Sequence, residues 1–352
     1  GSTMAKDPEN EARSRALRNI RSAKARPVRD AAEWAAAITQ GDRTALAQGI
    51  SLIESRRESD RPAVEALLHA MPAPPHPTRR IGITGVPGVG KSTWIEAAGT
   101  TLLERGHQVA VLAVDPSSSR TGGSMLGDKT RMESLSRHPR AFVRPSPAGD
   151  TLGGVARATM ETIQLCEAAG FDRILIETVG VGQSETEVRR MTDAFLLLML
   201  PGGGDGVQGI KRGILEWADV VIMNKADGAA EQIDLARSSL AAFRGALALM
   251  QAPPEGAPPL LGLGSGLDAK GVGNWVDQIE TRLAEAIENG SFEARRRRQE
   301  LDALDALLDR EILTRVKSKP GFKAAWKRLQ SESHHTQSAA FDALRRLLDS
   351  LD

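Results

Sequence analysis

The chain has 352 residues, enough for one large domain with appendages or for two domains, and its 41% hydrophobic residues can build a substantial core. Its 46 basic and 45 acidic residues leave a net charge of +1. This balance excludes the strong positive field typical of nucleic-acid or anionic-membrane binding, so we expect neither partner. The one cysteine, Cys166, excludes an internal disulfide, disfavours a cysteine-based metal site and is predicted to be a buried thiol on a helix.

The first 78 residues are predicted to lie outside the main domain. Gly1-Ser2-Thr3 before Met4 is typical of a cloning remnant, and residues 1–27 are expected to form this tag and a flexible basic segment. Apolar positions at helical spacing, among them Leu46, Ile50 and Ile53, predict a helical extension over residues 28–78 that ends in a proline-rich linker.

The sequence also bears on location. No apolar stretch approaches the ~20 residues that span a bilayer, and residues 4–9 lack the apolar core of a signal peptide. We therefore expect a bacterial cytoplasmic protein, or a mitochondrial matrix protein if a leader has been removed.

Residues 79–290 are predicted to form a doubly wound α/β domain with a mostly parallel sheet. Short apolar runs alternate with helical segments, at residues 81–84, 109–114, 173–177, 194–200, 220–223 and 260–263. Strands that are apolar on both faces are typical of a parallel sheet covered by helices on both sides.

Residues 291–352 are predicted to form a C-terminal helical arm. It carries two apolar stripes, Leu301/Leu304/Leu308/Ile312 and Phe341/Leu344/Leu348/Leu351. These faces exceed what a short arm can bury on itself, which predicts a homodimer. Helices that fold back on the α/β domain are the alternative.

A complete phosphate-binding loop follows the first strand: Gly85-Val86-Pro87-Gly88-Val89-Gly90-Lys91-Ser92, with Thr93 opening a helix that runs to Glu104. Glycines let successive backbone N–H groups face a phosphate, and the helix N-terminus adds its positive dipole end. Lys91 can reach the β- and γ-phosphates, and the Ser92 hydroxyl can ligate Mg²⁺.

Asn224-Lys225-Ala226-Asp227 follows the strand at residues 220–223 and predicts guanine recognition. The Asp227 carboxylate can accept hydrogen bonds from guanine N1–H and the exocyclic amine, whereas adenine offers neither in that arrangement. Asn224 would brace the loop, and the Lys225 stem would lie across the base. The amides of Ser265, Gly266 and Leu267 can face guanine O6, although a plain flexible turn is equally compatible with this composition. Both motifs meet where ligands bind in such sheets, beyond the strand carboxyl ends.

Three carboxylates are candidates for the phosphate side of the site. Asp115 ends the second strand, Asp128 lies in a glycine- and serine-rich loop suited to a switch, and Glu177 opens the turn Glu177-Thr178-Val179-Gly180. The Gly180 amide can contact the γ-phosphate. Each carboxylate alone also suits a capping role, but their shared placement at strand ends favours function.

These motifs resemble one family in particular. The phosphate loop, Val114-Asp115-Pro116-Ser117-Ser118, the string Glu177-Thr178-Val179-Gly180-Val181-Gly182-Gln183-Ser184-Glu185 and Asn224-Lys225-Ala226-Asp227 resemble the methylmalonyl-CoA mutase-associated GTPase chaperones, formerly described as arginine/ornithine transport kinases. The Glu177 string is the most discriminating, because Ras-like GTPases carry Asp at its first position.

The resemblance implies a GTPase that needs Mg²⁺, binds GTP and GDP, and forms a homodimer through its C-terminal arm. It implies an adenosylcobalamin-dependent acyl-CoA mutase as client, whose cofactor loading GTP hydrolysis gates and which it protects from inactivation. We identify no cobalamin site in the chain itself. Ser92, Asp128 and Glu177 would surround Mg²⁺ with Asp115 close by, and residues 201–211 would form a further switch with Lys211 as its charge donor.

Two sequence features qualify this picture. Gly206-Val207 stands in that switch where family members carry acidic and apolar residues, which loosens the expected coupling. Val181 follows Gly180 in place of a water-orienting glutamine, so intrinsic hydrolysis is expected to be slow.

Two other functions stay open, a GTPase that delivers nickel to hydrogenase or urease and a kinase for a small molecule or protein. Nickel delivery requires Cys/His clusters, yet His334-His335 are the only adjacent pair among the six histidines. A kinase requires an acceptor pocket and a positioned base, and the sequence identifies neither.

Overall fold

The computed structural model describes residues 30–55, 57–114, 132–145, 152–178, 184–202, 217–248, 257–331 and 337–349. The chain divides into two compact units, Gly1–Glu280 and Thr281–Asp352. This division falls inside one helix, whereas the sequence places the boundary near Gly290, where that helix has ended. Among the described residues, no helix is both long and apolar enough to cross a bilayer.

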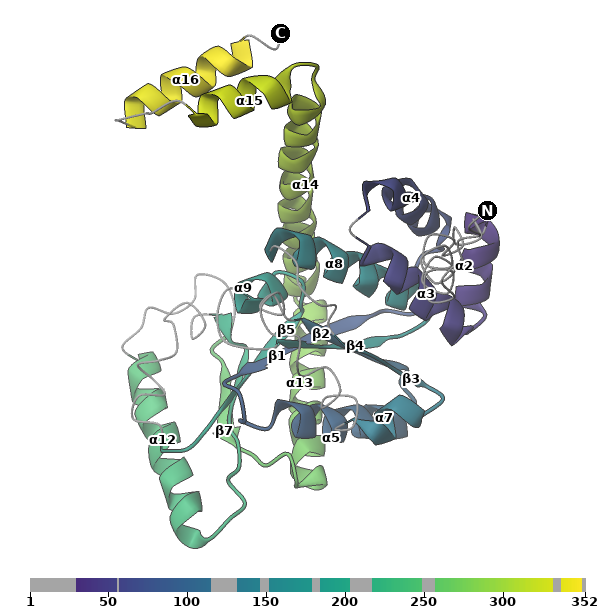
Figure 1. The fold of residues 1–352 in the computed structure, drawn as a ribbon. Coiled ribbons are helices and arrows are strands. Elements are labelled where there is room, and N and C mark those ends of the chain that lie inside the picture. The colour runs from purple at the N-terminus through teal and green to yellow at the C-terminus, as the bar shows by residue number, and fades with distance from the viewer. Residues whose placement is uncertain are drawn as a thin grey trace, which may run out of the picture. The chain divides into compact units, whose positions relative to one another are not determined.

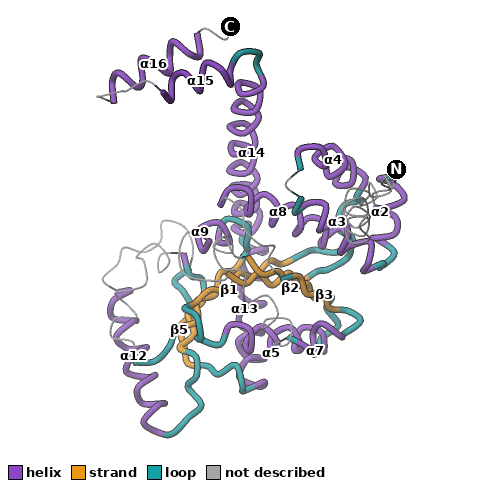
Figure 2. The backbone as a smooth tube through the Cα atoms, viewed as in Figure 1, coloured by secondary structure: helices purple, strands orange, loops and turns teal. Residues whose placement is uncertain are grey.

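The first unit is built on a parallel sheet of seven strands in the order β3-β2-β4-β1-β5-β6-β7 (Figures 1 and 2). Every pair of neighbouring strands in it is parallel. The strands are β1 (Arg79–Gly85), β2 (Val109–Val114), β3 (Ala141–Arg144), β4 (Arg173–Thr178), β5 (Ala194–Met199), β6 (Val220–Met223) and β7 (Leu260–Leu263). The predicted doubly wound α/β class is confirmed, and β3 is a strand that the sequence analysis missed.

Helices cover both faces of this sheet because its strands are apolar on both sides. Helices α5 (Lys91–Glu104) and α7 (Glu133–Arg137) lie on one face, and α8 (Leu152–Ala168) and α9 (Ser184–Arg189) on the other (Figure 1). Helix α12 (Ala230–Ala248) contacts β6 and β7, and α13 (Ala269–Glu288) places Trp275 against Gly262 of β7. Cys166 of α8 is fully buried, as predicted.

The predicted N-terminal helical extension is present and packs on α8. It consists of α2 (Ala31–Thr39), α3 (Arg43–Ile53), the short 3-10 helix η1 (Glu58–Asp60) and α4 (Arg61–Ala70). Its apolar face joins the main core. Arg61 forms a two-pronged ion pair with Glu161 of α8, at 3.0 and 2.6 Å, and Arg144 of β3 pairs with Glu54.

Buried and half-buried acidic side chains hold the amino-terminal edge of the sheet. Asp172, Asp193 and Asp219 each accept a backbone N–H from a neighbouring strand or its entry, at 2.8, 2.7 and 2.8 Å. On the same edge, Arg80 pairs with Glu167 through contacts of 2.7 and 2.8 Å, and both side chains are under 10% exposed. The loops at the opposite, carboxyl-terminal edge therefore project from a sheet whose other end is fixed.

The second unit is helical, as predicted for the arm. It contains α14 (Ser291–Ser318), α15 (Phe322–Ser331) and α16 (Gln337–Asp349). Helices α15 and α16 pack together and bury Ala343 and Leu347. The predicted stripe on α14 is exposed, with Leu304 at 61% and Leu308 at 55%, so the described arm does not cover it. Dimerisation through these faces stays a prediction.

Candidate guanine-nucleotide site

The phosphate loop joins β1 to α5 in a conformation that requires glycine. Gly85, Gly88 and Gly90 have φ angles of +154°, +80° and +102°, which side chains rarely adopt. A Cβ on Gly85 would lie 2.6 Å from the Leu198 carbonyl oxygen, and one on Gly90 would lie 2.8 Å from Asn224 Nδ2. Gly85 and Gly90 therefore exclude a side chain by space as well as by backbone strain, whereas Gly88 disfavours one by strain alone.

The first turn of α5 is arranged to receive an anion. Gly90 is the N-cap and offers no side-chain acceptor to the helix N–H groups. The Lys91 ammonium lies inside the loop, 2.8 Å from the Gly85 carbonyl oxygen and 3.4 Å from that of Val86. The described loop thus brings a cation and the first backbone N–H groups of a helix to one place, which is the chemistry that a phosphate chain requires.

Asn224 connects the phosphate loop to the two loops that the sequence assigned to the base. Its Nδ2 donates to the Val89 carbonyl oxygen at 2.8 Å, and its Oδ1 accepts from the Gly266 N–H at 3.1 Å. The side chain is 1% exposed. A buried amide with both ends satisfied fixes the positions of its partners, which is the bracing role expected for Asn224.

Lys225 is held in a strained backbone conformation. Among the described residues it is the only non-glycine with positive φ, at 59°. Such a conformation costs roughly 1 kcal/mol for a residue with a side chain, and it persists where neighbours impose it. Here the Ala226 N–H is bonded to the Gly264 carbonyl oxygen at 3.0 Å, and the Gly264 N–H to that of Met223 at 2.9 Å.

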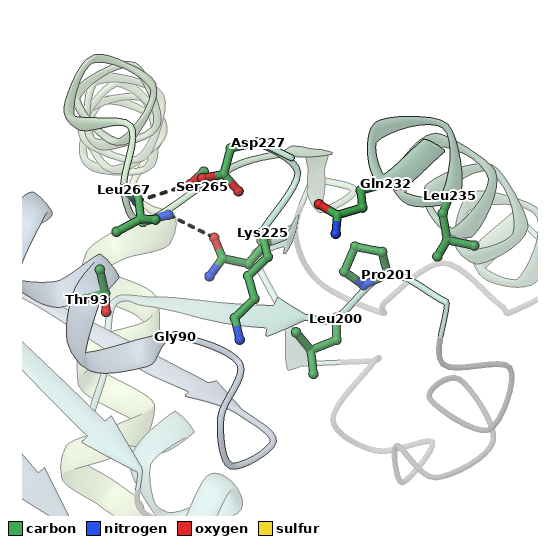
Figure 3. Close-up of a pocket in the computed structure, with 12 residues that line it drawn as sticks. Gly90, Thr93, Leu200, Pro201, Lys225, Asp227, Gln232, Leu235, Ser265 and Leu267 are labelled. Atoms are coloured by element: carbon green, nitrogen blue, oxygen red, sulfur yellow. Dashed lines mark hydrogen bonds between the residues drawn. The ribbon is translucent and has the colours of Figure 1, made fainter. Parts of the chain in front are cut away.

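These loops enclose a pocket of about 480 Å³ (Figure 3). The predicted residues that line it are Gly90, Thr93, Asn224, Lys225, Asp227, Ser265, Gly266 and Leu267. In Figure 3 Asp227 lies between the Leu267 loop and α12, and the Lys225 side chain extends toward Gly90. The volume suits a small organic ligand, and the arrangement places a carboxylate, an alkyl stem and backbone amides around it.

The pocket also contains residues that the sequence analysis did not assign to a site. Leu200 follows β5, and Gln232 and Leu235 come from α12. Pro201 also lines the pocket and is the first residue of the switch predicted over residues 201–211. Leu235 and Leu267 are the exposed large hydrophobic residues described in the first unit, at 48% and 80%. The local sequence around Gln232 and Leu235 contains no motif that predicts a binding role, because their place at the pocket depends on how α12 packs.

The phosphate-side carboxylates are described only in part. Glu177 is 7% exposed near the end of β4, where it is in register with Ile83 of β1. Asp115, Asp128, Gly180 and Lys211 lie outside the described residues. A hydroxyl at Ser92 and a carboxylate at Glu177 fit Mg²⁺, which prefers oxygen ligands and completes its shell with phosphate oxygens and water. No group of three metal-binding side chains is present in the described ranges.

Comparison with known proteins decides the family. A family model described as methylmalonyl Co-A mutase-associated GTPase MeaB matches residues 46–321, more than half of the chain. The chain belongs to this family of GTPases. The phosphate loop and the guanine loops described above lie inside the matched range.

Similar proteins occur in bacteria and animals. A probable GTPase of Mycobacterium tuberculosis is 51% identical over 288 residues, covering 81% of this chain and 84% of that protein. The GTPase ArgK of Escherichia coli is 42% identical, covering 79% and 84%. The mouse mitochondrial methylmalonic aciduria type A homolog is 42% identical, covering 81% and 71%.

One solved structure is similar over nearly its full length. The crystal structure of an LAO/AO transport system kinase matches with a TM-score of 0.69 and 31% identity, covering 91% of this chain and 97% of that one. Family, relatives and fold agree, and the protein is a P-loop GTPase that hydrolyses GTP to GDP and phosphate. In such chemistry the protein mainly positions the phosphates and stabilises charge, and the Lys91 ammonium is the described cation in place to do so.

Proposed function

We propose that this GTPase is a chaperone for an adenosylcobalamin-dependent acyl-CoA mutase of the methylmalonyl-CoA mutase type. In this role GTP hydrolysis gates loading of the cofactor and protects the mutase from inactivation. The observation that carries the proposal is the family match over residues 46–321, since the family is described by its association with that mutase. The name of the mouse relative refers to methylmalonic acid and supports the same client.

The nucleotide site has defined parts in this proposal. Asp227 accepts hydrogen bonds from guanine N1–H and the exocyclic amine, and Lys225 and the loop at Ser265–Leu267 flank the base. Lys91 binds the β- and γ-phosphates. Ser92 and Glu177, together with Asp128 and nearby Asp115, hold Mg²⁺, which supplies charge neutralisation at the phosphates. Thr93 and the glycines of the phosphate loop bind the remaining phosphate oxygens.

The signal from the client is proposed to pass through residues 201–211. The first residue of this segment, Pro201, follows β5 and lines the pocket together with Leu200, and residues 203–211 lie outside the described residues. Lys211, outside the described residues, is the proposed charge donor that the bound mutase brings toward the phosphates. The homodimer formed by the arm presents two such sites.

A kinase remains the second candidate, because the similar crystal structure carries a kinase name. The two functions differ in the fate of the γ-phosphate. We expect label from γ-labelled GTP in free phosphate only. Label that accumulates in protein or in an amino acid would contradict the chaperone proposal and favour phosphotransfer.

The decisive experiment measures how much adenosylcobalamin is loaded onto the apo-mutase in the presence of this protein. For the parent protein, loading should depend on GTP and should be altered by a non-hydrolysable GTP analogue. For Asp227→Asn, the same loading should depend on xanthosine triphosphate, because the new amide faces the xanthine carbonyl. This exchange of nucleotide dependence assigns the effect to this site and not to a contaminating GTPase.

Two outcomes would refute the proposal. One is loading that proceeds equally well without any nucleotide. The other is GTP hydrolysis whose rate the apo-mutase and the loaded mutase leave unchanged.

A further inference from the structure

Two buried threonines meet at the carboxyl ends of β1 and β4. The Thr178 hydroxyl donates to the Thr84 hydroxyl oxygen over 2.8 Å, and the Ile83 carbonyl oxygen lies 3.5 Å from Thr178 Oγ1. Thr84 is 2% exposed and Thr178 is 0% exposed. Since both residues are buried, the Thr84 hydroxyl depends on Thr178 for its hydrogen bond, and for the Thr178 hydroxyl Thr84 is the nearer of two acceptors.

This pair lies where the backbone ladder between the two strands stops. The last register pair between β1 and β4 joins Ile83 to Glu177. In contrast, β1 continues beside β5 as far as Gly85, and β4 continues beside β2 as far as Thr178. The hydroxyl contact is therefore the next connection between the two strands after their backbone pairing has ended.

The elements that leave this point form the phosphate side of the site. β1 passes directly into the phosphate loop, and Thr178 is the last residue of β4. Side chains alternate along a strand, so Thr84 and Thr178 point to the face opposite Ile83 and Glu177. Gly82, two residues before Thr84 on the same face, lies against Val188 of α9.

We propose that Thr84 and Thr178 are positioning residues for GTP hydrolysis. Their hydroxyl pair sets the separation between the phosphate loop and the Glu177 end of β4 after the ladder has ended. The pair does not touch the nucleotide, and it acts through the backbone of the two strand ends. GDP lacks the γ-phosphate that is transferred to water, so in this proposal the pair affects the reaction of GTP more than the binding of GDP.

The primary test is Thr178→Val, which removes the hydroxyl and nearly keeps the shape. We expect kcat to fall about tenfold, because small displacements of reacting groups have large effects on rate, while KM stays within about twofold. GDP affinity should stay within about twofold of the parent value. Thr178→Ser retains the hydroxyl and should restore kcat to within about twofold of the parent.

Thr101→Val is the matched control. The Thr101 hydroxyl donates to the Ala97 carbonyl oxygen at 3.0 Å on α5. It lies about 15 Å along that helix from Lys91, at 1.5 Å per residue. This variant also removes one threonine hydroxyl bond and should leave kcat unchanged.

The double variant Thr84→Val/Thr178→Val separates positioning from folding. Replacing both hydroxyls with methyl groups leaves no orphaned polar group, so the stability lost in Thr178→Val should return. The low kcat should persist, because the connection between the strand ends is still missing. Recovery of kcat together with stability would overturn the proposal, as would a Thr178→Val protein that hydrolyses GTP like the Thr101→Val control.

Discussion

Asn224→Ala tests whether one side chain connects the phosphate loop to the guanine loops. The substitution removes the donor to Val89 and the acceptor for Gly266, at 2.8 and 3.1 Å. Each buried group left without a partner lowers stability by roughly 1–3 kcal/mol. Because Asn224 is 1% exposed, water cannot fully replace it, and we expect the free energy of unfolding to fall by about 2–4 kcal/mol.

The assay is urea unfolding of the nucleotide-free protein, followed by calorimetric titration with GDP. Asn289→Ala is the matched control, because Asn289 makes one exposed hydrogen bond to the Ser291 N–H at 2.9 Å. That variant should lose no more than about 0.5 kcal/mol. GDP affinity should fall in Asn224→Ala only, since the two halves of the site are then no longer held together. Equal unfolding midpoints and equal GDP affinities for the two variants would refute the connecting role.

Four other substitutions or treatments have expected outcomes. Asp227→Asn should weaken GTP binding by roughly 1.5–3 kcal/mol and favour xanthosine triphosphate, and equal GTP affinity by calorimetry would contradict the assignment. Glu167→Ala leaves Arg80 buried without its ion-pair partner and should lower the unfolding free energy by about 3–5 kcal/mol in urea titrations. Burial raises the pKa of the Cys166 thiol, so a maleimide should label it only after unfolding, and stability should decline as the pH rises above about 8.5, where the unfolded thiol ionises. A chain truncated after Gly290 should be monomeric by light scattering, and a truncated dimer would remove the arm from the interface.

Much of the fold could be predicted because the signals are local. Six of the strands are continuous apolar runs, and the structure places them within two residues of the predicted bounds. β3 was missed because it has only four residues, ends in Arg144 and is buried only in its first half. Helix α2 lies inside the predicted helical extension, but the sequence does not indicate its bounds, since it is mostly alanine and only Ala35 and Ile38 are buried.

The residues of the candidate site likewise fall into those that a local sequence motif predicts and those that depend on tertiary packing. The phosphate loop and the Asn224 motif are short contiguous strings whose geometry follows from glycine conformations and strand ends. Both can therefore be predicted from the sequence alone. Gln232 and Leu235 reach the pocket only through the packing of α12. The contact between Thr84 and Thr178 joins residues 94 positions apart and depends on the register of two strands that are not consecutive in the chain.

The two edges of the sheet contribute differently to stability and to ligand binding. At the amino edge, buried carboxylates such as Asp193 bind backbone N–H groups of neighbouring strands, and the ion pair of Arg80 with Glu167 is desolvated. At the carboxyl edge, Lys225 holds a positive φ, which lowers stability, and Leu267 is 80% exposed, so its side chain gains no burial free energy on folding without a ligand. A bound nucleotide that covers Leu267 recovers part of this free energy, so binding and folding are thermodynamically linked at the carboxyl edge. Substitutions at the amino edge should therefore change unfolding equally with and without GDP, whereas those at the carboxyl edge should change the stabilisation that GDP confers.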